Sequence, residues 1–423
     1  MNSITKDANV FAYSYQGVST KVNDMTLNSN LIVDNSYDTL GRLTQKVNKT
    51  PGGTVINSYN YMLNNSDQRT KVTFADGKYI SYGYNLAGEI TGAQMYNADA
   101  SANNTYKYGF NYDAAGNPTQ RETQGQTRNY TFNILNQFAS ATAPTSTNVI
   151  GKAAPPSVAP FTVKVNSESA EVYSDGGWVK QNVALNSGAN QIDIEVKDKF
   201  NRSASATKTI NLGSAPVFTC DANGNMTSDG VWAYTWNDEN LLITATKAND
   251  KKVEFTYDGF GRMRVLKNYA WVSDAWTLES EKRLVYDETL IIAELDSTDT
   301  LKNSYLWGMS LSGDLYASGG VGGLLVADMN GSKEFPAYDG NGNVTAYTSA
   351  TGTILSRQEY SPFGALVSKE GTSQSPYRFS TIYLEPTTNL YCYLYRKYNS
   401  SHGRWLSRDP PYTNIHPGDL TGG

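Results

Sequence analysis

The chain has 423 residues, enough for more than one domain, and only 18% of them are charged. A formal net charge of −5 and a pI near 5.3 argue against a nucleic-acid partner, because such a partner requires a basic surface. No stretch is long and apolar enough for a transmembrane helix, and no apolar core of a signal peptide follows the first residues.

A short motif recurs along the chain: an aromatic residue, Asp or Asn, two variable residues, Gly, and then Arg or Asn, followed by an apolar residue and Thr. Its main positions are Tyr37, Asp38, Gly41, Tyr84, Gly88, Tyr112, Asp113, Gly116, Asp221, Gly224, Tyr257, Asp258, Gly261, Tyr338, Asp339 and Gly342. The aromatic residue is expected to end a strand and pack inward, while Asp or Asn opens a turn by bonding its own backbone. Gly supplies the positive φ of a short hairpin loop. Copies about 20 to 30 residues apart indicate a repeat array, so the sequence predicts an all-β run of hairpins.

The array is expected in two blocks that flank a different segment. Residues 1–145 form the first repeat block, in which aromatic residues alternate with small or polar ones at the period of a half-buried strand. Residues 214–370 form the second repeat block. Cys220 takes the aromatic position of its copy and is interpreted as a buried apolar substitute. Two cysteines cannot form a disulfide framework, although a single Cys220–Cys392 disulfide remains an alternative.

The repeat rhythm stops over residues 146–213. Pro-rich stretches, such as Ala153-Ala154-Pro155-Pro156-Ser157, predict linkers. Short alternating segments over 161–165, 191–198 and 206–212 favour a small inserted β-sandwich. This insert looks like the immunoglobulin-like modules of bacterial surface proteins. The alternative is an elaborated repeat hairpin.

Residues 371–423 form the C-terminal part. Its conspicuous stretches are Pro376-Tyr377-Arg378-Phe379-Ser380, Leu390-Tyr391-Cys392-Tyr393-Leu394-Tyr395-Arg396-Lys397-Tyr398 and Gly403-Arg404-Trp405-Leu406-Ser407-Arg408-Asp409-Pro410. Alternation predicts one strand over 390–398 that is buried on both faces apart from Arg396. The whole segment is expected to fold back as a plug.

With this C-terminal segment, the repeats resemble the YD repeats of the RHS family. That family includes bacterial polymorphic toxins, insecticidal toxin-complex C components, wall-associated proteins and teneurins. The resemblance implies a β-solenoid sheet that curls into a shell or spiral. It also implies a secreted or cell-surface protein whose partner is its own C-terminal toxin segment, with no cofactor.

The resemblance also implies a candidate catalytic pair, Arg404 and Asp409, because the family's core segment can act as an aspartyl self-protease. Both side chains are expected near a low-dielectric inner wall. The sequence departs from the family pattern after Pro410, where the second Asp-Pro motif is absent, so a purely structural role is the alternative. His402 and His416 lack partners at metal-ligand spacing, and no metal site is predicted.

Three functions remain open at this stage. The first is a non-enzymatic scaffold that encapsulates or presents a C-terminal toxin. The second is an adhesin or wall-associated module that binds cell-surface glycans (carbohydrate binding) or a partner protein. The third is the self-protease that releases a toxin.

Overall fold

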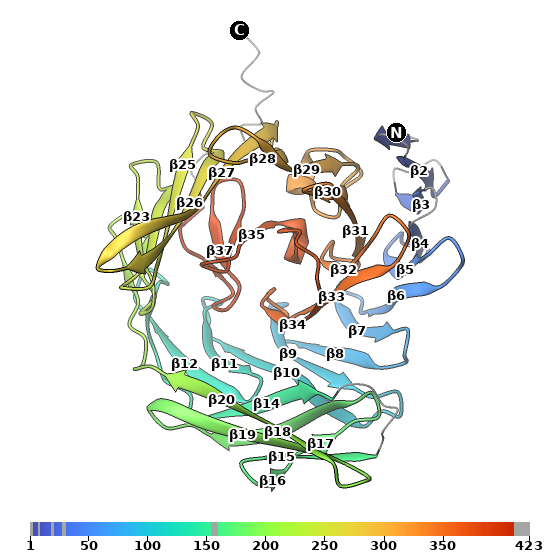
Figure 1. The fold of residues 1–423 in the computed structure, drawn as a ribbon. Coiled ribbons are helices and arrows are strands. Elements are labelled where there is room, and N and C mark those ends of the chain that lie inside the picture. Colours follow the sequence, from blue (N-terminus) through green and yellow to red (C-terminus); the bar gives the residue numbers. More distant parts are fainter. Residues whose placement is uncertain (1–2, 7–8, 18–20, 28–30, 154–159, 410–423) are drawn as a thin grey trace. The chain divides into compact units, whose positions relative to one another are not determined.

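The computed structural model describes residues 3–6, 9–17, 21–27, 31–153 and 160–409 (Figure 1). Antiparallel strands dominate these residues, so the all-β prediction is confirmed. No helix in this part of the chain is both long and apolar enough to cross a bilayer. Much of the predicted Pro-rich linker and the whole of the stretch after Asp409, including His416, lie outside the described residues.

The chain divides into two compact units. Unit 1 comprises Met1–Tyr61 and Cys220–Gly423, and unit 2 comprises Met62–Thr219. These limits cut across the four parts expected from the sequence, whose boundaries therefore stay a prediction.

Unit 1 contains strands from both repeat blocks and the C-terminal segment. Those of the first block are β1 (Ser3–Lys6), β2 (Asn9–Tyr15), β3 (Val22–Leu27), β4 (Leu31–Tyr37), β5 (Leu43–Lys49) and β6 (Val55–Leu63), which crosses the unit limit. Those of the second block are β21 (Thr219–Cys220, also at the limit), β22 (Met226–Ser228), β23 (Ala233–Trp236), β24 (Leu242–Lys247), β25 (Lys251–Tyr257), β26 (Met263–Val272), β27 (Ala275–Asp287), β28 (Leu290–Leu295), β29 (Leu301–Trp307), the 3₁₀ turn η2 (Ala317–Gly320), β30 (Leu324–Met329), β31 (Ser332–Tyr338), β32 (Val344–Thr348), β33 (Ile354–Tyr360) and β34 (Leu366–Gly371). The C-terminal segment has the 3₁₀ turn η3 (Phe379–Thr381), β35 (Tyr383–Glu385), β36 (Leu390–Cys392), β37 (Lys397–Asn399) and β38 (Arg404–Trp405).

The two repeat blocks share one core in unit 1. Phe11, Leu27, Leu31, Val33 and Ile56 of the first block pack with Leu325, Val326, Phe335, Ala337 and Ala346 of the second. Full burial of each large apolar side chain stabilises the fold by about 1.5–3 kcal/mol. Polar groups join the same blocks: the Asn48 amide donates to the Tyr338 carbonyl (2.8 Å), and Arg357 donates to the Ile56 carbonyl (2.6 Å). These contacts therefore hold together strands that are distant in sequence.

Unit 2 contains the rest of the first block and the insert. Its repeat strands are β7 (Arg69–Phe74), β8 (Tyr79–Tyr84), β9 (Ile90–Tyr96), β10 (Ala102–Tyr112), β11 (Pro118–Thr123), β12 (Gln126–Phe132) and β13 (Phe138–Ala141). The insert has β14 (Ser146–Lys152), β15 (Phe161–Val165), β16 (Glu168–Ser169), β17 (Glu171–Val172), β18 (Gly177–Ala184), β19 (Gly188–Asp198) and β20 (Ser203–Leu212). Repeat strands pair with their neighbours in sequence, whereas the insert forms one sheet of order β14-β18-β17 and another of order β16-β15-β19-β20. Trp178 and Val183 of the first insert sheet pack with Val163, Val165 and Ile192 of the second, as in a small sandwich.

Candidate functional site

The repeat motif forms a five-residue turn, which we call the repeat turn. Repeat turns occupy residues 38–42, 64–68, 85–89, 113–117, 133–137, 221–225, 237–241, 258–262, 339–343 and 361–365. In the turn that starts at Asp258, one carboxylate oxygen accepts the N–H groups of Phe260 and Arg262, both at 3.0 Å. Gly261 has φ of 73°, which a residue with a Cβ seldom adopts. The expected roles of Asp and Gly are therefore visible in the geometry of this turn.

In eight of the ten repeat turns the first and fifth side chains are chemically complementary; the other two have Asn237 with Leu241 and Ser361 with Ala365. Where Asp comes first, a donor is fifth: the pairs are Asp38–Arg42, Asp113–Asn117, Asp221–Asn225, Asp258–Arg262 and Asp339–Asn343. In three of the turns that begin with Asn, its amide donates to Glu or Gln: the pairs are Asn64–Gln68, Asn85–Glu89 and Asn133–Gln137. A carboxylate accepts only, whereas an amide can also donate, which accounts for the match. The sequence motif includes the fifth residue as Arg or Asn, but its hydrogen bond to the first side chain was not predicted.

Six repeat Tyr residues each join their turn to an earlier strand. Tyr hydroxyls donate to backbone carbonyls 14 to 22 residues earlier, in the pairs Tyr37–Val22, Tyr84–Arg69, Tyr112–Ile90, Tyr257–Leu242, Tyr338–Leu324 and Tyr360–Val344. Burial raises the pKa of Tyr112 to about 12. The expectation that these rings pack inward agrees with the structure, in which Tyr338 is buried and the other four are part-buried: Tyr37, Tyr84, Tyr112 and Tyr257. A register shift accompanies the Tyr at all five positions, whether the ring is buried or part-buried, so this bulge is a constant feature of the repeat.

Neighbouring repeat turns also bond one another. In unit 2, Gln68 donates to the Gly88 carbonyl (3.3 Å) and Asn117 donates to the side-chain oxygen of Asn136 (2.9 Å). In unit 1, Asn225 likewise donates to Asn240 (2.8 Å). Every second turn of an antiparallel meander lies on the same edge, so the repeat turns of unit 2 form a row along one sheet edge, and those of the second block in unit 1 form another.

In unit 1 the C-terminal segment covers this row. Thr381 donates to the Gly342 carbonyl (2.7 Å), and the hydroxyls of Tyr391 and Tyr398 donate to Gly364 (3.1 Å) and Phe363 (2.9 Å). These contacts place η3, β36 and β37 against the last two repeat turns, and Figure 1 shows β35 and β37 (red) within the same unit. The segment thus docks on the wall through hydroxyl donors aimed at turn carbonyls.

The far end of the segment reaches the earlier turns of the second block. The Leu406 carbonyl accepts the N–H of Met226 (2.8 Å). A Cβ at Gly224 would lie 2.4 Å from Arg408, and one at Gly261 would lie 3.3 Å from the Tyr395 ring. These glycines are therefore required twice, for their positive φ and for the close approach of the segment.

Two buried polar groups anchor the segment further. Glu294, which is 1% exposed, accepts the Tyr305 hydroxyl (2.7 Å) and forms an ion pair with Lys282 (3.2 Å), which also donates to Tyr383 of β35 (3.3 Å). Lys397 of β37 is 2% exposed, and burial lowers its pKa. Its ammonium lies over the rings of Phe255 (5.3 Å) and Tyr257 (5.4 Å), which offsets part of the desolvation.

The proposed catalytic residues do not have the environment expected from the sequence. Asp409 forms an ion pair with Arg396, and its side chain is 71% exposed, so the prediction of a low-dielectric carboxyl is wrong. Arg404 is part-buried on β38, where it lies opposite Asn399. The single strand predicted over 390–398 is also wrong, because Cys392 pairs with Lys397 and the residues between them form a turn.

Other groups capable of chemistry are sparse. His402 lies in the turn before β38, 3.9 Å from the buried carboxylate of Asp229. Cys220 and Cys392 are free thiols, and Cys220 is part-buried rather than buried. Among the described residues, no three His, Cys, Asp or Glu side chains gather as metal ligands would.

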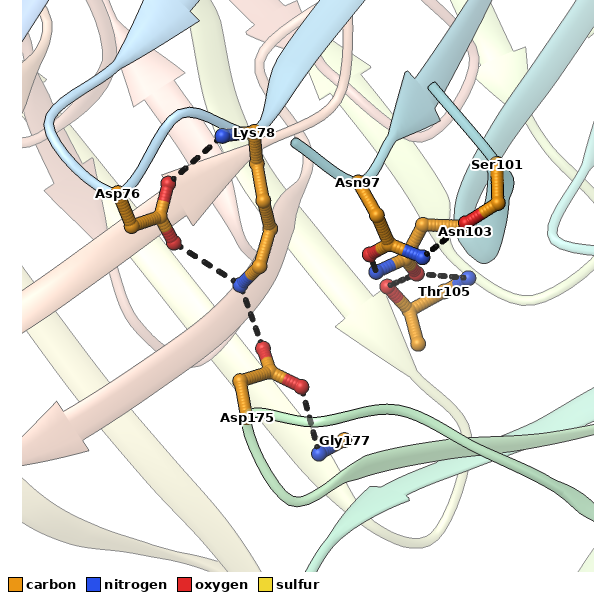
Figure 2. A network of polar contacts seen from close by, with 8 residues as sticks. All are labelled: Asp76, Lys78, Asn97, Ser101, Asn103, Thr105, Asp175 and Gly177. Atoms are coloured by element: carbon orange, nitrogen blue, oxygen red, sulfur yellow. Dashed lines mark hydrogen bonds and ion pairs between the residues drawn. The ribbon is translucent and has the colours of Figure 1, made fainter. Parts of the chain in front are cut away.

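The insert is joined to the repeat sheet of unit 2 by a separate polar network (Figure 2). Lys78 of the β7–β8 turn contacts Asp76 (3.0 Å) and Asp175 of the β17–β18 turn (2.5 Å). Nearby, the Tyr173 hydroxyl accepts the N–H of Asn104 (2.9 Å) and donates to Glu171 (2.8 Å). The insert therefore rests on the sheet edge opposite the row of repeat turns.

Two family models match this chain. The teneurin YD-shell model matches residues 181–418, and the model of glucodextranase domain B matches residues 145–213, which is the insert.

Individual relatives match more distantly. The tRNA3(Ser)-specific nuclease WapA of Bacillus spizizenii is 27% identical over 263 residues, which are 58% of this chain and 10% of the relative. The tRNA nuclease WapA of Bacillus subtilis is 24% identical over 256 residues, again 58% and 10%. The crystal structure of TcdB2-TccC3-Cdc42 is 18% identical with a TM-score of 0.41, and the match covers 96% of this chain and 20% of that one. The chain thus spans about a tenth of the length of these curated relatives.

Proposed function

This chain belongs to the teneurin YD-shell family, and we propose from that premise that it forms part of a shell wall that holds a C-terminal toxin segment. The WapA relatives are tRNA nucleases by name, which fits a wall that accompanies a toxin. A secreted or cell-surface location belongs to the same proposal. The role is structural, and the toxin segment is the partner.

One observation carries the proposal: the C-terminal segment is bonded to successive repeat turns. Tyr391, Tyr398 and Thr381 each donate to a turn carbonyl. Such anchoring fixes the chain up to Asp409 against the wall, so that whatever follows starts from a defined point. Self-cleavage is not part of the proposal, since Asp409 is exposed and paired with Arg396.

The test is limited proteolysis of the longest gene product that carries this chain. We expect the sequence after Asp409 to resist protease as long as the wall stays folded. The double variant Tyr391→Phe/Tyr398→Phe removes two anchoring hydroxyls and should make that sequence, and residues 377–408, cleave earlier than the wall. Tyr316→Phe, at a 38% exposed ring, is the matched control. Cleavage of the wild-type downstream sequence as fast as that of a free peptide would overturn the holding function.

A further inference from the structure

The outer strand of the insert, β20, has an unpaired edge. The insert sheet has the order β16-β15-β19-β20, so β20 lies at its border. It pairs with β19 along its full length, from Gly188 opposite Leu212 to Lys197 opposite Ser203, without a register shift. On its other side, no strand of the described chain pairs with it. The backbone donors and acceptors along this border are thus available to another strand.

This edge lacks most of the features that normally prevent strand addition. Natural edge strands are shortened, bulged, charged or interrupted by proline. β20 has 10 residues (Ser203–Leu212), no proline and no bulge, and its single charged side chain is Lys208. Every residue from Ser203 to Thr209 is exposed, on both faces of the strand. Ala204 and Ala206 are exposed as well, although they share a face of the strand with Ile210, which packs against the insert core.

Hydrogen bonds within the insert also order β20 before any partner strand pairs with it. The hairpin turn before it begins at Asp198, which accepts Arg202 Nε (2.6 Å) and the backbone N–H of Phe200 (2.8 Å). Along the strand, Thr207 donates to Asp193 (2.7 Å), and Asn190 donates to the Ile210 carbonyl (3.3 Å). A preorganised strand loses little conformational freedom when it pairs, which favours binding.

We propose that the free edge of β20 pairs antiparallel with β20 of a second copy of this chain, about a two-fold axis at Thr207. With this register, Thr207 lies opposite Thr207 of the second copy. Ile210 lies opposite Ala204, and Lys208 lies opposite Ala206, on the face that carries the insert core. Large residues therefore meet small ones, and no charged residue stands directly opposite a like charge. The strand is self-complementary, which selects a second copy over an unrelated strand. The inference is independent of the proposed shell function.

The first test is a disulfide across the two-fold axis. Directly opposed residues of an antiparallel pair have Cβ atoms about 4.5–5.5 Å apart, within adjustment of disulfide geometry. In the full chain, Thr207→Cys should form a covalent dimer under mild oxidation. Ser203→Cys is the matched control, since its two copies would stand at opposite ends of the paired strands. Equal cross-linking of the two variants would overturn the proposed register.

The second test is sedimentation of the full chain over a concentration series. We expect a monomer–dimer equilibrium that Ala206→Lys abolishes, because the substitution places a new ammonium group opposite Lys208 of the second copy, while the melting temperature stays unchanged. Ser205→Lys, on the other face and opposite Thr209, should retain the dimer. A wild type that stays monomeric throughout, or a dimer that survives Ala206→Lys, would overturn the proposal.

Discussion

At the scale of single residues, most repeat turns have a side-chain hydrogen bond between their first and fifth residues. Asp258 accepts a hydrogen bond from Arg262, and Asn133 donates one to Gln137. In both, the first side chain also accepts two backbone N–H groups of the turn. Where the two side chains are paired, Asp is therefore matched by a donor and Asn by Glu or Gln.

This rule predicts a rescue by the second substitution. Asp258→Asn leaves Arg262 without its carboxylate and should cost about 1 kcal/mol in the free energy of unfolding, within the range of a charge-assisted hydrogen bond near the surface. Adding Arg262→Gln recreates the Asn133–Gln137 pairing and should restore part of the loss, although Arg262 also donates to the Glu288 carbonyl (3.0 Å). Chemical denaturation of both single variants and the double variant measures the coupling. A coupling free energy indistinguishable from zero would refute the rule.

The repeat Tyr makes two contributions that substitution can separate. Tyr257→Phe removes the hydroxyl that donates to the Leu242 carbonyl (2.7 Å) and should cost about 1 kcal/mol. Tyr257→Ala also removes the ring and should cost about 3 kcal/mol. Tyr395→Phe, at a 38% exposed ring, is the control and should stay near zero. Equal costs for Phe and Ala at position 257 would mean that the ring contributes nothing.

At the scale of elements, the sequence was sufficient to predict the hairpins but not the contacts that hold neighbouring strands together. Asp, Gly and alternating aromatic residues are local signals, so the repeat turns at Asp38, Asp113 and Asp339 follow from the motif alone. The bulge at each aromatic residue, and the carbonyl that its hydroxyl finds, depend on a strand 14 to 22 residues earlier. The strand predicted over 390–398 is broken between Cys392 and Lys397. Beyond the break, Lys397 lies over the rings of Phe255 and Tyr257, a contact that local alternation cannot predict. Contacts between distant segments override local alternation there.

Acid should loosen the Asp-first turns before the Asn-first turns. Hydrogen bonds from Arg42, first of all from its backbone N–H, lower the pKa of Asp38. A carboxyl with a depressed folded pKa contributes stability above its unfolded pKa of about 3.9 and loses it as the pH falls through the folded value. Hydrogen exchange, corrected for intrinsic rates, should therefore rise in residues 38–42 below about pH 4. The 133–137 turn, which contains no titratable group, is the internal control, and an equal rise in both turns would contradict the assignment.

At the scale of the molecule, unit 2 shows how a repeat array accommodates an insert. The insert leaves and rejoins the array at adjacent points: Ala141 donates to the Pro216 carbonyl (3.1 Å), Ser140 forms a bridge with Val217, and the Phe138 and Phe218 rings stack at 5.0 Å. The sequence showed where the repeat pattern stops, but not that the two ends of the insert lie next to each other. The ion pair of Lys78 with Asp175 then ties the insert back to the repeat sheet.

Because the ends of the insert meet, its removal should leave the array folded. We expect a chain that lacks residues 146–213, closed by a short Gly-Ser joint, to retain one cooperative unfolding transition in denaturant. The loss of the insert's contacts to β7–β10 should expose the β7–β8 turn and the backbone near Asn104, which hydrogen exchange would detect. Lys78→Met in the full chain is the companion variant, because it removes the ion pair and keeps the insert. It should raise the hydrogen-exchange rate of residues 173–177 and leave that of the repeat array unchanged. A deletion variant without a cooperative transition would show that the insert is an integral part of the wall.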